Sequence, residues 1–541
     1  MKSTLISLTL SLPFLLLYSL LPSTRYNTDG FRVLSSLHRI TIDPAGTTDF
    51  LPLNWQTAYQ QPHYFRQNVQ KHFFFPIYAH IFYTISRSLG LKTTGIKPLQ
   101  IANALSATLT IFLFAQLLIS KALPLPTVIL STIGLGFSTA FATQATNIAE
   151  AVSAAPFLIF ALIFLEKRKP FIASILLGIS AACYLLSLLV APFLILFSTI
   201  RPRRLLSFFL MVTSGITFII YLTLLIAAGN HTAQSLANAL FFFPEQGTFG
   251  GFKLSNLIST PLGFISSIFP VLPENFSGIK NSLLLKNPHP ALLIPLIPAG
   301  ILLLALIIHL SSDESKNSPG TALLLTSILA ALVWDPYHQK IWLYGNLGVW
   351  LLLANSRPAR TLLIIIVFFV VPLNIASIVK NHHPNPKWFA AEKMAHFIFF
   401  EHNAGEKKIV LGNWEPEFVY LTAFLPDTCL LSIPDLILET KKDPLRFRSV
   451  LDSIQDNYQN GSVYFVNIFN RSEDELKNFY LNRLKFPCFR NWQKTTRQFI
   501  KLLWRDATTG TTLYYFQPEG EKVRLLDPAP IFDRLDRYET L

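Results

Sequence analysis

The sequence predicts a mostly α-helical membrane protein: a polytopic helical domain, with interfacial helices, followed by a small extracytoplasmic α/β domain. Three observations lead to this fold class. Only 14% of the 541 residues are charged and 51% are hydrophobic, whereas a soluble protein carries about a quarter charged residues. Long apolar runs recur up to about residue 380. The composition then changes abruptly, which divides the chain into a membrane domain at 1–380 and an α/β domain at 381–541.

Apolar runs long enough to be spanning helices predict the membrane domain. They lie near 3–22, 99–119, 125–143, 148–165, 205–228, 291–310, 320–334, 340–355 and 361–379. A further run of about 30 residues, 171–200, is broken near Leu185-Leu186-Ser187 and fits two short helices better than one. Since no small-residue cleavage site follows the first run, we interpret it as a retained helix rather than a signal peptide.

Basic clusters predict the orientation of these helices. Lys167-Arg168-Lys169, Arg201-Arg203-Arg204 and Arg357-Arg360 are the densest short clusters, so we expect them on the cytoplasmic side. If the aromatic stretch Phe73–Gly90 lies on the membrane surface, all three fall on that side, with about 11 crossings. The N-terminus is then cytoplasmic and the C-terminal domain extracytoplasmic. The alternative is that Phe73–Gly90 also crosses and that a later segment does not.

Large extracytoplasmic segments follow from this orientation. They are 23–98, 229–289 and 380–541, and within them 27–42 and 232–243 have the pattern of interfacial helices. The segment 229–289 contains Phe241-Phe242-Phe243-Pro244-Glu245 followed by the glycine-rich stretch Gly247–Gly251. We interpret it as a mobile lid with Glu245 at the site. The alternative is a passive connector.

The C-terminal domain alternates helical and strand patterns. Helices are predicted at 387–400, 415–424, 443–458 and 473–484, and strands at 407–411, 462–468, 499–505 and 511–516. No glycine-rich phosphate loop or nucleophile elbow occurs there, so the sequence predicts no catalytic motif in this domain.

The net charge of +14 lies entirely in the membrane domain. Residues 381–541 contain 21 basic and 21 acidic residues, which leaves 24 basic and 10 acidic residues for positions 1–380. This excess fits anchoring at the cytoplasmic face and attraction to phosphate-bearing lipids. Nucleic acid is not expected as a partner, because no basic stripe with interleaved aromatics occurs. The three cysteines lack a CxxC spacing, which argues against zinc, although Cys429 and Cys488 could form a disulfide.

Acidic residues at predicted helix boundaries are the candidate catalytic groups. Asp29 follows the first helix and Glu150 precedes the run 151–165. A carboxylate at a membrane boundary costs free energy unless it is solvated, paired or metal-bound. Each residue has a structural alternative: Asp29 could cap an interfacial helix, and Glu150 could interact with a helix dipole.

Two basic and aromatic stretches suit a lipid phosphate. In the first, Lys71 and His72 precede Phe73-Phe74-Phe75-Pro76, which combines charged donors with rings for an apolar chain. The second, Trp334–Lys340, contains His338 and Lys340 and lies between two apolar runs. The alternatives are snorkelling side chains and an interfacial aromatic belt.

The order of these features resembles the GT-C superfamily of integral-membrane glycosyltransferases. The branch with protein O-mannosyltransferases and lipid A aminoarabinose transferases is the most similar, and the resemblance covers about residues 1–380. By position, it implies that Asp29 activates the acceptor or binds metal, and that Glu150 is a second acidic site residue. It also implies that Lys71, His72 and Lys340 lie near the lipid phosphate. Gly30 stands where some members have a second acidic residue, so only Asp29 remains as a ligand for Mg²⁺ or Mn²⁺.

The resemblance implies transfer of a sugar from a polyprenyl-phosphate-linked donor to an extracytoplasmic hydroxyl group of a lipid, glycan or protein. A carboxylate, Asp29 by preference, would accept the proton of the acceptor, and basic residues would stabilise the leaving phosphate. We expect a bacterial inner membrane protein that contacts membrane lipids. Two alternatives stay open: a transporter or flippase of a lipid-linked precursor, and a non-catalytic membrane assembly subunit. The sequence leaves the sugar, the acceptor and the oligomeric state undetermined.

Overall fold

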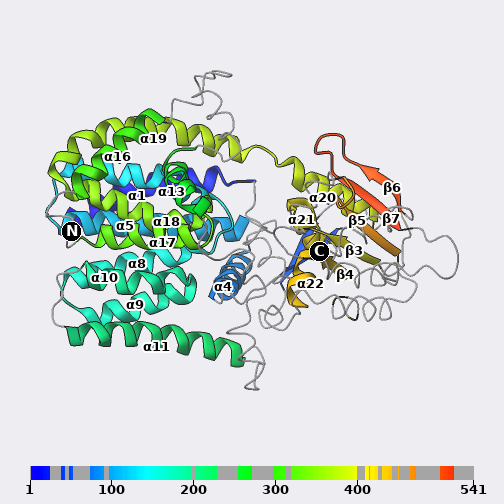
Figure 1. The fold of residues 1–541 in the computed structure, drawn as a ribbon, viewed down its shortest axis with the longest axis horizontal. Coiled ribbons are helices and arrows are strands. Elements are labelled where there is room, and N and C mark those ends of the chain that lie inside the picture. Colours follow the sequence, from blue (N-terminus) through cyan, green and yellow to red (C-terminus); the bar gives the residue numbers. More distant parts are fainter. Residues whose placement is uncertain are drawn as a thin grey trace, which may run out of the picture. The chain divides into compact units, whose positions relative to one another are not determined.

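The computed structural model is mostly helical and contains a small mixed sheet (Figure 1). It describes residues 2–24, 38–42, 48–52, 74–90, 97–197, 203–227, 254–270, 296–310, 318–398, 408–413, 415–424, 429–440, 447, 449, 462–470, 486 and 500–516. The chain divides into two compact units. Unit 1 comprises Met1–Gly30, Gln70–Ala227 and Phe249–Pro384, and unit 2 comprises Phe31–Val69, Ala228–Thr248 and Asn385–Leu541.

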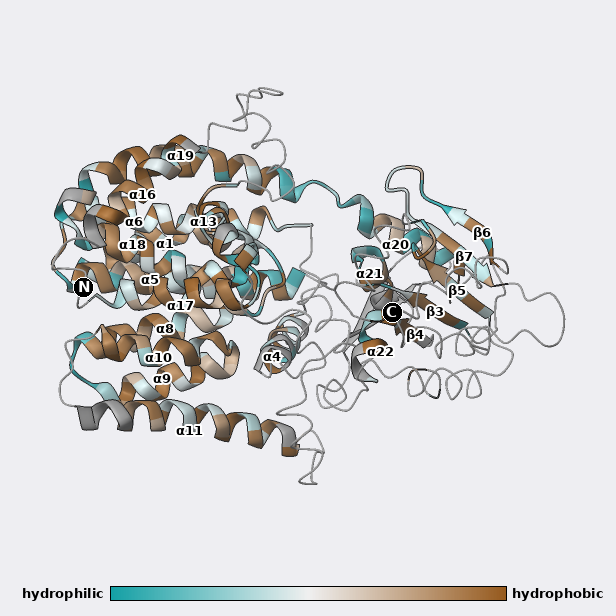
Figure 2. Ribbon diagram, viewed as in Figure 1, coloured by the Kyte–Doolittle hydropathy of each residue, from teal (hydrophilic) through white to brown (hydrophobic). Residues whose placement is uncertain are grey.

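Unit 1 is a bundle of apolar helices, most of which agree closely with the predicted runs. They are α1 (Lys2–Leu20), α4 (Phe74–Ser88), α5 (Lys97–Ser120), α6 (Leu125–Phe137), α7 (Thr139–Thr146), α8 (Ala151–Glu166), α9 (Pro170–Cys183), α10 (Leu186–Leu196), α11 (Arg203–Ala227), α13 (Leu254–Ile268), α16 (Leu296–Leu310), α17 (Pro319–Val333), α18 (Gln339–Asn355) and α19 (Arg357–His382). The exception is α13, because it lies within the segment 229–289 that was predicted to be a lid or a connector. Figure 2 shows that helices such as α8, α10 and α19 are hydrophobic along most of their length.

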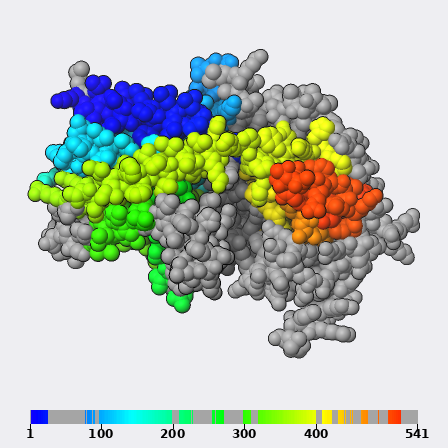
Figure 3. Space-filling model, turned by 90° about the horizontal axis from the view of Figure 1, so that it is seen from above, coloured from blue at the N-terminus to red at the C-terminus, as the bar shows by residue number. Residues whose placement is uncertain are grey.

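The exposed side chains of the bundle identify an integral membrane protein. On the face seen in Figure 3, α1 and α19 lie at the surface. Leu5 and Leu16 on α1 are 65% and 63% exposed, and Phe368 on α19 is 72% exposed. Within the described ranges, three helical stretches are long and apolar enough to cross a membrane, with a fourth if α6 and α7 form one bent span. The predicted number of crossings remains a prediction.

The core of the bundle depends on α18, whose residues from Ile341 to Ala354 are all buried. Its partner α17 packs against it through two glycines. A Cβ on Gly348 would lie 2.6 Å from the carbonyl oxygen of Gly320, and a Cβ on Gly320 would lie 2.8 Å from that of Gly348. Both distances are shorter than a van der Waals contact, so this close approach of the two backbones requires glycine at both positions.

Two helix breaks shape the bundle. The predicted break near Leu185 is confirmed, since α9 ends at Cys183 and α10 begins at Leu186. The predicted run 125–143 is instead two helices, α6 and α7, bent by 60°. At Ser138, between them, the hydroxyl group donates to the carbonyl of Gly134 (2.8 Å) and accepts from the indole N–H of Trp350 (2.7 Å). The side chain at the bend therefore supplies hydrogen bonds that hold the broken span against α18.

Unit 2 contains a five-stranded sheet of order β4-β3-β5-β7-β6. Its strands are β3 (Lys408–Gly412), β4 (Cys429–Ser432), β5 (Ser462–Val466), β6 (Ile500–Arg505) and β7 (Thr512–Phe516), accompanied by α20 (Pro386–His396), α21 (Pro416–Phe424) and α22 (Ile433–Glu439). β3 pairs in parallel with β4 and β5, and β7 pairs antiparallel with β5 and β6. The predicted α/β character is confirmed, although the sequence analysis missed β4 and α22.

One predicted helix is wrong in its described part. Residues 27–42 were expected to form an interfacial helix, but His38–Ile42 is strand β1, paired antiparallel with β2 (Thr48–Pro52). The β-branched sequence Ile40-Thr41-Ile42 favours an extended backbone once a partner strand is present. The predicted helices at 232–243 and 473–484 lie outside the described residues, as does nearly all of that at 443–458.

Candidate functional site

Glu150 precedes the first residue of α8 and is completely buried. It lies at the end of a short segment, Asn147–Ala149, that follows α7 and leads to α8. The same end of the bundle receives the C-terminus of α1, because the backbone N–H of Ser23 donates to the carbonyl of Thr146 at 2.8 Å. A carboxylate at the N-terminus of a helix interacts favourably with the helix dipole. The fold thus places a buried negative charge at this end of α8.

Two amides of α5 hold the segment that leads to Glu150. Asn103 donates both hydrogens of its side-chain amide, to the carbonyls of Asn147 and Ala149, each at 2.9 Å. Gln100, one turn earlier, donates to the carbonyls of Ser23 (2.7 Å) and Thr146 (3.2 Å). Asn103 is fully buried and Gln100 is nearly so. These bonds satisfy carbonyl groups that a buried turn would otherwise leave without donors.

Lys340 is the partner of Glu150. Its Nζ lies 3.0 Å from Oε1 of Glu150, although the two residues are 190 positions apart in the chain. The lysine side chain is 11% exposed and the glutamate side chain is 0% exposed. A pair so withdrawn from water pays a large desolvation cost that stability alone does not explain, because replacing a buried ion pair by apolar residues often stabilises a protein.

The turn before α18 fixes the position of Lys340. The carboxylate of Asp335 accepts from the backbone N–H of Tyr337 at 2.9 Å, and the indole N–H of Trp342 donates to the carbonyl of Pro336 at 2.6 Å. A Cβ on Gly263 of α13 would lie 1.9 Å from that same carbonyl oxygen. His338 is the N-cap residue of α18 and is partly exposed. The turn therefore packs directly against α13 and presents Lys340 from the first turn of α18.

The predicted site residues divide into two groups. The structure brings Glu150 and Lys340 into direct contact and places His338 two residues before Lys340. Asp29, Lys71, His72 and Glu245 lie outside the described residues, so their roles stay predictions. Sequence analysis missed Asn103 and Gln100. The signal was available: two amides three residues apart near the start of an apolar helix need buried partners.

The described residues do not form a metal centre. Among them, no group of three or more potential ligands from His, Cys, Asp and Glu occurs. Glu150, the carboxylate at the site, already has the ammonium group of Lys340 against it, and this group competes with a cation for the same oxygen. Asp29, which the sequence leaves as the single candidate ligand for Mg²⁺ or Mn²⁺, lies outside the described residues.

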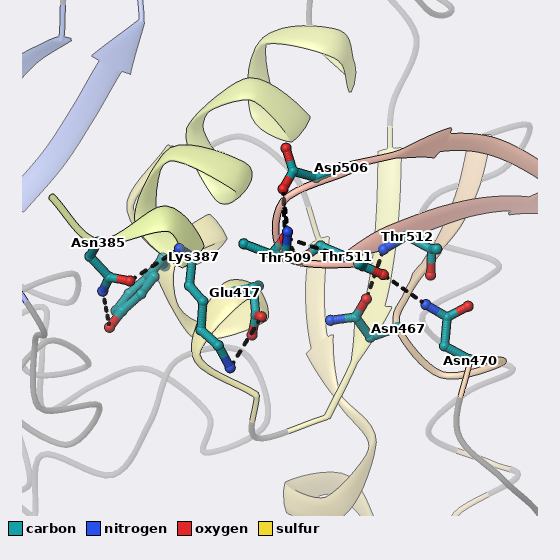
Figure 4. A network of polar contacts seen from close by, with 11 residues as sticks. Asn385, Lys387, Glu417, Asn467, Asn470, Asp506, Thr509, Thr511 and Thr512 are labelled. Atoms are coloured by element: carbon teal, nitrogen blue, oxygen red, sulfur yellow. Dashed lines mark hydrogen bonds and ion pairs between the residues drawn. The ribbon is translucent and has the colours of Figure 1, made fainter.

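The polar contacts of unit 2 stabilise its own fold (Figure 4). Glu417, at the start of α21, pairs with Lys387 of α20 at 3.4 Å. In the hairpin between β6 and β7, desolvation raises the pKa of Asp506, but hydrogen bonds from Thr509 and Thr508 outweigh it and lower the pKa below its ordinary value. The side-chain oxygen of Asn467 accepts from the backbone N–H of Thr512 at 2.8 Å. These contacts join α20 to α21, close the turn between β6 and β7, and connect the residue after β5 to β7.

Comparison with known proteins shows which of them share this fold. No family model matches the sequence, and a search of curated proteins finds no match. Among solved structures, ArnT from Cupriavidus metallidurans, bound to undecaprenyl phosphate, is similar with a TM-score of 0.54. The likeness covers 94% of this chain and 99% of that chain, at 11% sequence identity. The chain shares its fold with ArnT. The predicted GT-C resemblance is thereby confirmed at the level of the fold, since ArnT is a GT-C glycosyltransferase.

A second solved structure is similar over most of the chain. It is the oligosaccharyltransferase of Archaeoglobus fulgidus in the apo form, with a TM-score of 0.45 and 12% sequence identity. The likeness covers 96% of this chain and 74% of that chain.

Proposed function

We propose that this protein is a membrane glycosyltransferase that moves a sugar from a polyprenyl-phosphate-linked donor to a hydroxyl group of an extracytoplasmic acceptor. The observation that carries the proposal is the buried ion pair between Glu150 and Lys340, at the end of the bundle where α1 and α7 end. The fold shared with ArnT supports it, because that protein binds undecaprenyl phosphate.

Lys340 is the residue that would contact the donor. In the proposed reaction the acceptor oxygen attacks the anomeric carbon while the bond from that carbon to the phosphate oxygen breaks. The electron pair of the broken bond goes to the phosphate, whose negative charge increases. A fixed ammonium group in a site that excludes water stabilises such a developing charge. Attack opposite the leaving phosphate inverts the anomeric centre.

Glu150 serves in this proposal to hold Lys340 in place and protonated. Its carboxylate is buried beneath the lysine, and Asn103 fixes the backbone on which it is carried. The proton of the acceptor hydroxyl goes to a second carboxylate, for which Asp29 is the candidate from the sequence. The protein is expected in the bacterial inner membrane, with this site at the extracytoplasmic side.

The test is a transfer assay on the purified full-length protein. The protein receives undecaprenyl-phosphate-linked sugars with a labelled sugar, together with a membrane extract as the source of acceptor. We expect transfer by the wild type and a loss of about a hundredfold for Lys340→Met, the size found when one charge-stabilising donor is removed. Lys121→Met is the matched control, because Lys121 pairs with Glu166 at the other end of α8.

Two outcomes would contradict the proposal. One is the absence of transfer by the wild type with every donor sugar tried, while the labelled lipid moves between leaflets, which would favour a flippase. The other is undiminished transfer by Lys340→Met.

A further inference from the structure

A second connection joins α8 to α18, one helical turn below the ion pair. Ala154 lies four residues after Glu150 on α8, and Tyr344 lies four residues after Lys340 on α18. Residues four apart lie on the same face of a helix. The faces that carry the ion pair therefore continue to Ala154 and Tyr344, and these two residues are also connected, through two serines.

Three hydroxyl groups form this connection. The hydroxyl oxygen of Tyr344 lies 2.5 Å from Oγ of Ser187, and Oγ of Ser187 lies 2.9 Å from Oγ of Ser180. Ser180 then donates to the carbonyl of Ala154 at 2.9 Å. Tyr344, Ser187 and Ser180 are all 0% exposed. Most hydroxyl groups buried so deeply in proteins are hydrogen-bonded, because an unpaired buried hydroxyl costs free energy.

The direction of this hydroxyl chain follows from counting protons. Each hydroxyl group has one proton. Ser180 gives its proton to the carbonyl of Ala154, which can only accept. Ser187 must therefore donate to Ser180, and Tyr344 must donate to Ser187. The hydrogen bonds therefore all run in one direction and end at a carbonyl of α8. They cannot pass a proton onward, so their role is to hold α18 and α8 together.

The serines come from the two sides of the break between α9 and α10. Ser180 lies in the last turn of α9, and Ser187 lies at the start of α10. Between them, the ring of Tyr184 packs edge-on against the ring of Tyr344, with centroids 5.8 Å apart. The turn of this hairpin thus contacts both α8 and α18 and connects them.

We propose that Tyr344 is a positioning residue: through Ser187 and Ser180 it fixes the register of α18 against α8, and so keeps Lys340 against Glu150. The importance of this register for catalysis rests on the proposed function, in which Lys340 binds the phosphate. The register itself is measured independently of any sugar transfer, through the reactivity of the Lys340 amine.

The experiment labels the full-length protein in detergent with acetic anhydride and measures the rate of acetylation at Lys340 by mass spectrometry. Only an unprotonated, accessible amine reacts, so the ion pair protects Lys340. We expect Tyr344→Phe and Ser187→Ala each to raise the rate by roughly threefold to tenfold, as the loss of one buried hydrogen bond allows. Glu150→Gln, which removes the partner directly, should raise the rate at least as much.

Tyr18→Phe is the matched control. It also deletes a buried tyrosine hydroxyl, whose bond to the carbonyl of Gly136 is 2.5 Å long, but on α1 and α6 rather than on the helices of the ion pair. This variant should keep the wild-type rate at Lys340. The double variant Tyr344→Phe/Ser187→Ala should react no faster than either single variant, because both break the same chain.

The proposal is overturned if Lys340 is acetylated at the wild-type rate in Tyr344→Phe but faster in Glu150→Gln. It is equally overturned if Tyr18→Phe raises the acetylation rate of Lys340 as much as Tyr344→Phe does. It is also overturned if Glu150→Gln leaves the rate unchanged. If Tyr344→Phe does not fold, Ser180→Ala breaks the last bond of the same chain and gives the same readout. If the transfer assay shows no sugar transfer but the acetylation rates change as expected, the proposed function is rejected, and the role of Tyr344 in fixing the register of α18 against α8 stands.

Discussion

The two ends of α8 each carry a glutamate paired with a lysine, and the two pairs differ in almost every physical respect. Glu150, at the N-terminal end, is completely buried, and its partner Lys340 is 11% exposed. Glu166, at the C-terminal end, pairs with Lys121, and their side chains are 35% and 19% exposed. The helix dipole favours a carboxylate at the first end and disfavours one at the second. The chain therefore has a buried polar centre at one end of the helix and an ordinary surface contact at the other.

Neutralising each glutamate in turn is the strongest test of this difference. Glu150→Gln removes the negative charge that faces the buried ammonium group of Lys340, so we expect a loss of about 3–5 kcal/mol in the free energy of unfolding and a severe loss of sugar transfer. Glu166→Gln breaks an exposed pair and should change stability by about 0–1 kcal/mol. Thermal unfolding in detergent, followed by tryptophan fluorescence, gives the ranking of the two variants.

Salt concentration supplies the control for that measurement. An exposed pair is screened at high ionic strength, whereas a buried pair is not. The small effect of Glu166→Gln should therefore vanish in high salt, and the effect of Glu150→Gln should persist. If the two variants lose the same free energy of unfolding at both low and high salt, the two ends of α8 do not differ in the way described.

The hydrogen bonds made near the two ends of α5 offer a second, smaller contrast. Asn103→Leu removes two hydrogen bonds, to the carbonyls of Asn147 and Ala149, and each buried hydrogen bond contributes about 0.5–1.5 kcal/mol. Ser120→Ala, at the other end of the same helix, removes one local bond to the carbonyl of Leu117 and should cost less than about 0.5 kcal/mol. Thermal unfolding and the transfer assay are run on both variants. If the two variants are equally stable, Asn103 does not hold the segment before Glu150.

A carboxylate outside the bundle is expected to give the smallest effect. The folded state lowers the pKa of Asp506 below its ordinary value of 3.8, so the ionised form stabilises the hairpin between β6 and β7 at neutral pH. A group with a lowered pKa contributes stability above that ordinary value and loses it as the pH falls through the folded value. Asp506→Asn should slightly destabilise the protein at pH 7 and make no difference in strong acid. A loss that is the same at both pH values would contradict the pKa direction.

Most of the apolar helices of the bundle could be predicted because a long apolar run identifies them, whereas α13 was missed because its apolar stretch is short. Even the break near Leu185 could be predicted, since a run of about 30 residues is too long for one crossing. The bend at Ser138 could not, because it depends on the indole of Trp350, more than 200 residues away in the sequence. The strand His38–Ile42 was missed for the same reason: its extended backbone depends on the partner Thr48–Pro52, and no local pattern identifies that partner.

The site could be predicted only as separate residues. Glu150 and Lys340 stood out individually, because charges at helix boundaries in an apolar chain are rare and costly. Their direct contact could not be inferred, since it depends on how α8 and α18 pack. Asn103 was missed because its importance lies in two backbone carbonyls of another segment, and a sequence does not show which carbonyls lack donors.

The short hairpin of α9 and α10 has a consequence for the surrounding lipid. Its helices contain 14 and 11 residues, which rise about 21 Å and 16 Å, whereas the hydrocarbon layer of a bilayer is about 30 Å thick. The bilayer must become thinner beside this hairpin, or other parts of the protein must cover its end. In the first case, phospholipid head groups sink toward the depth of Tyr344 and Ser187. In the proposed function, a donor lipid that diffuses along this side would then bring its phosphate closer to the level of Lys340 before it makes any specific contact.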